Sequence, residues 1–253
     1  MIKIKQLIKS IIRSITSVFY AGKRFCCPIC GGDFRKLKAF KGIFYVKGNL
    51  VNHYTENAIC PKCGSDTRHR FLVSFINKND LLKSGIKLLH FAPEQCIYDL
   101  ISKNTSIEYH CCDINPSAYY RAVKIDITDI QYPKNSFDAV ICCHVLEHIK
   151  DDTKALKELY RILKPGGWVL VSIPIYGEKT FEDVSLDSKG REKMYGIESH
   201  LRMNGLDFRK KITAAGFDVN IYSVGDIPGC YFDTSVSSPH IESDKYLFYC
   251  RKI

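Results

Sequence analysis

The stretch SFDAVICCHVLEHIKDDTKALKELYRILKPGGWVLVSI, residues 136–173, decides the fold. Its first part, Phe137–Cys143, is almost entirely apolar, as a strand buried on both faces requires. Residues 151–163 carry apolar side chains at helical spacing behind an aspartate that can cap a helix. Pro165-Gly166-Gly167 ends this helix, and residues 168–173 are apolar again. The order of strand, helix and strand predicts a crossover between neighbouring parallel strands.

The same alternation continues outward in both directions. Further strands are predicted at 87–91, 108–112, 122–125, 217–222 and 246–251, with helices at 67–82, 94–103 and 206–215. This pattern predicts an α/β fold with a Rossmann-like, doubly wound and mostly parallel sheet.

Basic residues are concentrated at the N-terminal end of the chain. The 253 residues carry a formal net charge of +10, and residues 1–70 hold 14 Lys and Arg against 3 Asp and Glu. A basic segment can contact the phosphates of nucleic acid or of an anionic membrane. A solvated basic surface explains the same charge equally well.

Residues 2–19 are predicted to form a basic amphipathic helix, because apolar residues recur at helical spacing beside Lys3, Lys5, Lys9 and Arg13. It could lie on an anionic membrane surface, or pack on its own domain or on a partner. The sequence has no apolar run of eighteen residues and no visible signal peptide. The expected location is therefore cytoplasmic, with peripheral attachment to the inner membrane surface as an option.

Two CPxC pairs, Cys27 with Cys30 and Cys60 with Cys63, predict a structural zinc site. Each pair can aim two thiolates at one ion, and the residues between the pairs suffice for the hairpins of a zinc ribbon. Two redox-active CxxC pairs are the competing interpretation, and Cys26 is a possible substitute ligand. The predicted domains are a helix at 1–22, a zinc-ribbon head at 23–68 and a larger domain at 69–253.

Residues 136–173 resemble class I S-adenosylmethionine-dependent methyltransferases, the type 11 group in particular, and the resemblance spans about 86–222. The CPxC…CPxCGSxxRHR head together with LHFAPE is similar to a bacterial subgroup with a zinc-ribbon head. The resemblance implies that S-adenosylmethionine is the cofactor. It implies that Asp113 and Ile114 contact the ribose side, that Asp126 and Ile127 contact adenine, and that Cys143 and His144 lie beside the reactive methyl group.

The loop after the first strand of the larger domain departs from the family pattern. Where the family has an acid and a glycine-rich turn, this chain has His90-Phe91-Ala92-Pro93-Glu94. We expect His90, Ala92 and Glu94 to lie at the cofactor, with Glu94 replacing the missing acid toward the methionine ammonium. The alternative is a degenerate loop in a protein that no longer binds the cofactor.

Two places supply candidate catalytic residues. His144 follows a buried strand directly and has a pKa range suited to a base, although it could equally be structural. The polar segment 180–205 is long for a loop and could form a substrate site with Asp183, His200 and Arg202, or a plain surface loop.

The expected function is methyl transfer to oxygen or nitrogen of a small-molecule, glycan or lipid-linked acceptor. An RNA methyltransferase that uses its basic zinc head to bind phosphates is the alternative, but the larger domain shows no stripe of interleaved basic and aromatic residues. A non-catalytic zinc-containing adaptor is the third possibility.

Overall fold

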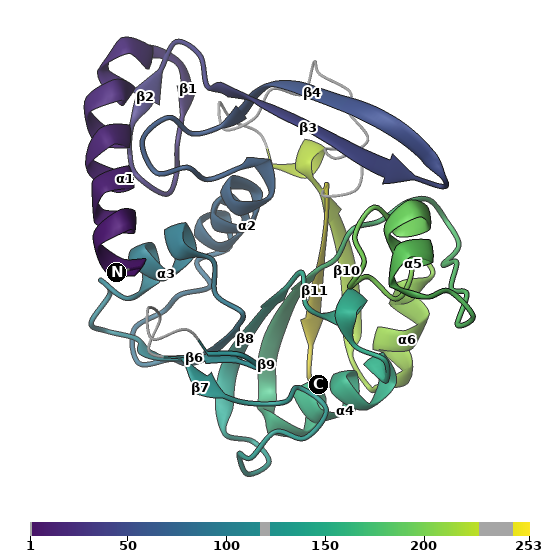
Figure 1. Cartoon of the computed structure of the whole chain (residues 1–253). Helices are drawn as coiled ribbons and strands as arrows, with labels where there is room; N and C mark the ends of the chain where they lie inside the picture. The colour runs from purple at the N-terminus through teal and green to yellow at the C-terminus, as the bar shows by residue number, and fades with distance from the viewer. Residues whose placement is uncertain (1, 117–121, 228–244) are drawn as a thin grey trace.

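A seven-stranded sheet forms the centre of the computed structural model, which describes residues 2–116, 122–227 and 245–253 (Figure 1). The strand order is β10-β11-β9-β8-β5-β6-β7, and only the pairs of β11 with β9 and with β10 are antiparallel. The mostly parallel α/β sheet is therefore confirmed. The strands are β5 (Lys87–Phe91), β6 (Glu108–Asp113), β7 (Val123–Lys124), β8 (Phe137–Cys143), β9 (Leu163–Ser172), β10 (Asp218–Ser223) and β11 (Tyr246–Arg251).

Helices cover both faces of the sheet, because side chains alternate along each strand. Leu88 belongs to the core beneath α2 (Thr67–Lys78) and α3 (Gln95–Ile101). Its neighbour Leu89 belongs to the core beneath α4 (Asp152–Ile162) and α6 (Phe208–Ala214). Figure 1 shows the two layers on either side of the strands. The sheet is thus doubly wound.

The larger differences from the sequence prediction are at two element boundaries and in one additional helix. Strand β9 begins at Leu163, five residues earlier than expected, because an irregular pairing with β8 accommodates the Pro-Gly-Gly turn, in which Gly166 has φ +77°. Helix α2 ends at Lys78. The segment expected to be a loop contains a helix, α5 (Ser188–Tyr195), which Asp187 caps.

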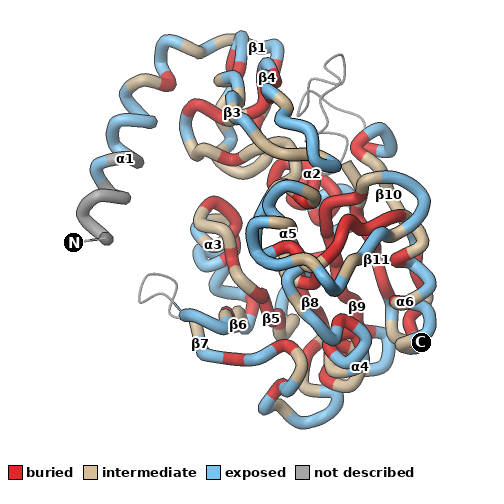
Figure 2. The backbone as a smooth tube through the Cα atoms, turned by 45° about the vertical axis from the view of Figure 1, so that its right-hand side comes forward, coloured by how far each residue is buried: buried red, intermediate tan, exposed pale blue. Residues whose placement is uncertain are grey.

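The leading helix α1 (Ile2–Ser17) lies along the four-cysteine head. Arg13 donates a hydrogen bond to the Cys63 carbonyl over 3.4 Å. Where their burial is described, its isoleucines are exposed: Ile8, Ile11, Ile12 and Ile15 are each at least 50% accessible (Figure 2). Among the described residues, no helix is long and apolar enough to cross a membrane.

Two antiparallel hairpins build the head. One pairs β1 (Ala21–Cys26) with β2 (Asp33–Phe34), and the longer one pairs β3 (Lys38–Val46) with β4 (Asn49–Ile59). The β3–β4 hairpin reaches across to α5, where the Lys47 amide donates to Met194 O and the Gly48 amide to Lys193 O, each over 3.0 Å. The head and the inserted segment around α5 therefore meet above the edge of the sheet (Figure 1).

Candidate functional site

The strand order reverses between β5 and β8, which places a crevice at the carboxyl ends of these two strands. Directly after β5 the backbone of Ala92 has φ +46°, and directly after β8 that of His144 has φ +54°. Non-glycine residues rarely adopt this conformation, and it is concentrated at functional sites. Both loops named from the sequence therefore lie at the switch point with unusual backbone geometry.

Glu94 is half-buried at the start of α3, where it occupies the N-cap position without making a side-chain cap bond. Its Oε1 lies 3.4 Å from His69 Nε2 and 3.8 Å from an Arg68 guanidinium nitrogen. Its Oε2 lies 3.8 Å from Nε2 of the buried His90, whose Nδ1 contacts the Tyr109 hydroxyl at 2.8 Å. Cationic groups from the start of α2 thus face an acid at the start of α3.

The electrostatics keep Glu94 ionised. Burial opposes ionisation, but contacts with His69 and His90 and the nearby charge of Arg68 outweigh it and hold the pKa of Glu94 well below its usual range. Within the described part of the chain, Oε2 has no hydrogen-bond partner. An ionised, buried carboxylate oxygen in a crevice can receive a cationic group of a ligand.

The two aspartates expected at the nucleoside lie at the ends of β6 and just beyond β7. Asp113 accepts a hydrogen bond from the Asn115 amide over 2.8 Å, and Asp126 accepts one from the Thr128 amide over 2.8 Å. Each therefore shapes its own turn through Oδ1. Beside them, Ile114 is 52% exposed and Ile127 is buried. An exposed isoleucine next to Asp113 offers an apolar surface to a flat ring.

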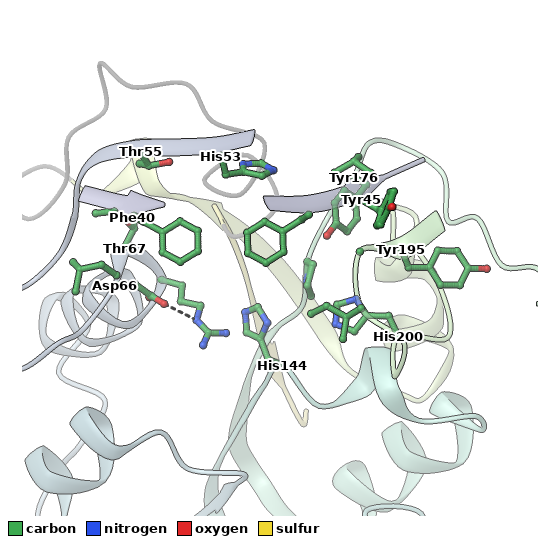
Figure 3. Close-up of a pocket in the computed structure, with 18 residues that line it drawn as sticks. Phe40, Tyr45, His53, Thr55, Asp66, Thr67, His144, Tyr176, Tyr195 and His200 are labelled. Carbon is green, nitrogen blue, oxygen red and sulfur yellow. Dashed lines mark hydrogen bonds and ion pairs between the residues drawn. The ribbon is translucent and has the colours of Figure 1, made fainter. Parts of the chain in front are cut away.

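A cavity of about 260 Å³ lies between the β3–β4 hairpin and the carboxyl ends of the strands (Figure 3). The hairpin contributes Phe40, Phe44 and His53, and the opposite side contributes Tyr176 and Tyr195. The Phe40 and Phe44 rings stack with centroids 6.0 Å apart. The cavity therefore has an aromatic roof, which a zinc-ribbon pattern alone did not predict.

His144 and His200 both line this cavity, and Figure 3 shows them on the side opposite the hairpin. His144 Nδ1 lies 3.3 Å from Oε1 of the fully buried Glu147. Burial, with smaller contributions from neighbouring histidines, lowers the pKa of His200 to about 4, so its ring is neutral at pH 7. Glu147 was not singled out from the sequence, although its spacing from His144 in HVLEH carried the signal.

Arg202 and Asp183 do not line the cavity. Arg202 is buried, and its five N–H donors bond to the Glu182 carboxylate and to the carbonyls of Leu146, Ile149 and Lys150. These contacts occupy every donor that an anionic substrate would need, so Arg202 holds the segment that carries His200. Asp183 accepts hydrogen bonds from the amide and hydroxyl of Ser185 and shapes a turn. His200 and Arg202 were expected to share one face of an extended segment. In the structure only His200 lines the cavity, and Arg202 points to other protein groups.

The four cysteines of the two CPxC pairs converge at the base of the head. Cys27 Sγ lies 3.6 Å from Cys63 Sγ, and Cys30 Sγ lies 3.7 Å from Cys60 Sγ. A tetrahedral zinc ion with Zn–S bonds of about 2.3 Å would separate its ligands by about 3.8 Å. The donor set and spacing therefore fit zinc, and Cys26 is not part of the group.

The two cysteine turns have the same backbone geometry. The Gly31 amide donates to Cys27 O and the Gly64 amide to Cys60 O, and both glycines have positive φ. The buried Arg70 donates to Ser65 O over 2.8 Å, which anchors the second turn. A buried guanidinium beside four sulfur ligands offsets the negative charge that a zinc tetrathiolate carries.

Residues 96–171 match a family described as a methyltransferase domain. This match covers less than half of the 253 residues. Among curated proteins, a ubiquinone biosynthesis O-methyltransferase of Albidiferax ferrireducens is 32% identical over 59% of this chain and 54% of its own length. One from Paracidovorax citrulli is 33% identical over 33% of this chain and 35% of its own length. The chain thus spans about half, or less, of these relatives.

Solved structures show the same fold around the methyltransferase domain. A 1,6-didemethyltoxoflavin-N1-methyltransferase of Burkholderia thailandensis, bound to 1,6-didemethyltoxoflavin and S-adenosylhomocysteine, has 13% identity. The two structures superpose over 74% of this chain and 78% of the other chain, with a TM-score of 0.52. A SAM-dependent methyltransferase of Archaeoglobus fulgidus superposes over 73% of this chain and 94% of its own chain. Its identity is 17% and the TM-score is 0.50. At these identities, the likenesses show a shared fold.

Proposed function

We propose that this chain transfers the methyl group of S-adenosylmethionine to an oxygen or nitrogen atom of a small-molecule, glycan or lipid-linked acceptor. The observation that carries the proposal is the carboxylate of Glu94. It is ionised at the switch point, and its buried Oε2 has no hydrogen-bond partner within the described chain. An anion placed there is suited to the ammonium of the cofactor's methionine end.

The remaining cofactor contacts follow from the positions of the loops. Arg68, whose guanidinium nitrogen is 3.8 Å from Glu94, is suited to the methionine carboxylate. Asp113, at the end of β6, would accept hydrogen bonds from ribose hydroxyls, with Ile114 beside it. Asp126 and Ile127 would face the adenine edge. His90 and Ala92 shape the loop below the methionine end, and Cys143 and His144 end the strand next to it.

The aromatic cavity is the proposed acceptor site. When bound, the cofactor supplies a methyl group on a cationic sulfur. The residues of this chain must hold an acceptor atom in line with it and take up the proton that the acceptor loses. His144 lies at both places, since it follows β8 and lines the cavity. A cavity of about 260 Å³ suits one ring system or the reactive end of a longer molecule.

The four-cysteine site is proposed to hold structural zinc. Four thiolates complete the coordination of the ion and leave no position for a substrate. The ion would fix the base of the β3–β4 hairpin, which carries the roof of the acceptor cavity. Zinc in this protein would therefore shape the acceptor site without taking part in the reaction.

Calorimetric titration with S-adenosylhomocysteine tests the proposed function. Wild-type protein is expected to bind it in the micromolar range, and Asp113→Ala should weaken binding by about 1.5–3 kcal/mol, the typical contribution of a hydrogen bond to a charged group. The matched control is Asp99→Ala in α3. Absence of binding to the wild-type protein would overturn the methyltransferase proposal and favour the non-catalytic adaptor.

RNA methylation remains the second candidate, because the basic residues concentrate in the head. Binding to RNA phosphates would fall steeply with salt concentration. A titration of labelled RNA at increasing salt therefore discriminates between the candidates. The RNA candidate expects affinity that is still measurable at physiological salt, whereas the small-acceptor proposal expects only weak binding that disappears below that concentration.

A further inference from the structure

A second group of potential metal ligands lies next to the floor of the acceptor cavity, which one of them, His200, lines. Glu147 and His148 belong to the short helix η2 (Leu146–His148) that follows β8, and His200 comes from the segment after α5. One ligand atom from each residue lies within 4.8 Å of the others. Figure 3 shows His200 next to His144 at this floor.

The Glu147 carboxylate has a charged contact with His144 but makes no hydrogen bond within the described chain. The residue is 0% exposed, and neither oxygen has a hydrogen-bond partner among the residues that the structure describes. Its closest charged contact is His144 Nδ1 at 3.3 Å. A buried carboxylate without hydrogen bonds is costly, and a bound cation is one of the few groups that compensate for it.

The two histidines are arranged as metal ligands are. His148 Nδ1 lies 3.1 Å from the Ser199 carbonyl oxygen, which can only accept, so this nitrogen carries the proton and Nε2 keeps its lone pair. A ligating histidine commonly donates its other ring N–H to such a carbonyl. His200 Nδ1 is buried without a hydrogen-bond partner in the described chain. The two rings meet edge to face with centroids 4.8 Å apart.

We propose that Glu147, His148 and His200 bind a divalent transition-metal ion next to the acceptor cavity, to whose wall His200 belongs. Two imidazoles and one carboxylate favour Mn²⁺, Fe²⁺, Co²⁺ or Zn²⁺ over Mg²⁺ or Ca²⁺, which prefer oxygen ligands. Bonds of about 2.1 Å allow ligand atoms to be at most about 4.2 Å apart. Small rotations, chiefly of the exposed His148, bring the three atoms within that limit.

This inference rests on the proposed methyl transfer and narrows its acceptor to a hydroxyl compound. Three protein ligands leave coordination positions open, and His200 connects the site to the cavity wall. An acceptor hydroxyl bound at such a position would have its pKa lowered. The hydroxyl oxygen then forms a bond to the methyl carbon, while the bond from that carbon to sulfur breaks and its electron pair stays on sulfur. The hydroxyl proton passes to His144, which lines the same cavity.

The test titrates zinc-loaded protein with Mn²⁺ and with Co²⁺, so that the four-cysteine site is already filled. Wild-type protein is expected to bind one equivalent of each ion, with a Kd that Glu147→Gln and His148→Ala each raise at least tenfold. His110→Ala, at a histidine of β6 that belongs to neither group of ligands, is the matched control and should leave the titration unchanged. Thermal unfolding of each variant verifies that it is folded.

The outcomes separate this inference from the proposed function. Failure of both ions to bind, or one equivalent that neither variant weakens, would overturn the metal site. Binding of S-adenosylhomocysteine is measured on the same samples and should not change in Glu147→Gln or His148→Ala. A protein that binds S-adenosylhomocysteine but no ion would therefore keep the methyltransferase proposal and lose only this one.

Discussion

Glu94 Oε1 lies 3.4 Å from His69 Nε2. This contact connects the loop after β5 to α2, the helix that follows the four-cysteine head. His69 Nδ1 lies 2.9 Å from Asp66 Oδ1 on its other side. One imidazole therefore sits between two carboxylates, one from the head and one from the proposed cofactor site. Burial alone would lower the pKa of His69, but the carboxylates raise it well above its usual value.

Replacing Glu94 with glutamine should weaken binding of S-adenosylmethionine at least tenfold, or about 1.4 kcal/mol, because the ammonium loses its counter-charge. The change also removes a partner of His69, so we expect a measurable loss of stability. Calorimetry measures the first effect and urea unfolding the second. Glu108→Gln, at an exposed acid paired with Lys87, is the control. Unchanged affinity of Glu94→Gln for S-adenosylmethionine would mean that Glu94 only stabilises the start of α3.

The contact of His69 with Asp66 and Glu94 should make stability depend on pH. Since the folded pKa of His69 is raised, its contribution is complete below the ordinary histidine pKa of about 6.5 and is lost as pH rises through the folded value. The carboxylates have lowered pKa values, so their part persists down to acid pH. His69→Gln should cost about 1.5–3 kcal/mol at pH 6 and less at pH 9. A cost that does not change with pH would contradict this explanation.

Replacing Cys63 with serine should remove the thiolate-bound zinc ion and lower the free energy of unfolding, because the head has only a small apolar core of its own. Zinc released by a thiol-modifying reagent measures the ion at this site. Cys250→Ala, at a buried cysteine of the sheet, should keep the full zinc content. A folded Cys63→Ser protein with unchanged zinc would show that these cysteines do not hold the metal.

Replacing Ala92 with glycine should stabilise the protein by up to about 1 kcal/mol, since glycine adopts the φ of +46° without the steric cost of a Cβ. Thermal or urea unfolding measures the change. Ala155→Gly, within α4, is a control with the opposite expected effect. It should lower the free energy of unfolding by about 1 kcal/mol. Destabilisation by Ala92→Gly would mean that the methyl group of Ala92 packs usefully in the loop.

The exposed apolar face of α1 should bind anionic vesicles. Because isoleucines and basic residues share this helix, binding to phosphatidylglycerol vesicles should exceed binding to phosphatidylcholine vesicles. Sedimentation with each vesicle type measures it, and replacing Ile11 and Ile15 with serine should abolish the difference. Equal sedimentation with both lipids would favour a protein partner for this face.

The sequence predicted the sheet well because its strands are buried on both faces and therefore read as continuous apolar runs. Phe137–Cys143 matches β8 residue for residue. The start of β9 was missed because Pro165 and Gly166 normally interrupt regular structure, whereas here a local irregularity in the pairing accommodates them. Helix α5 was missed because its surface carries few apolar residues that would show helical periodicity.

The proposed site was only partly foreseeable, because its walls come from distant segments. Glu94 and His144 follow strands and could be placed by strand order. No local pattern indicates that the hairpin with Phe40 and Phe44 folds over His144, or that Arg202 turns inward to Glu182. These arrangements depend on tertiary packing, and the sequence supplied only the residue types.

The bridge between the β3–β4 hairpin and α5 has a consequence for measuring how the acceptor cavity opens. The amides of Lys47 and Gly48 donate to carbonyls across this bridge, and the two chain segments share the cavity walls. When the segments separate, these two amide protons lose their acceptors and become free to exchange with solvent deuterium. Their exchange rates therefore report how often the β3–β4 hairpin separates from α5, and this can be measured before any acceptor is identified. An acceptor that spans roof and floor would slow them.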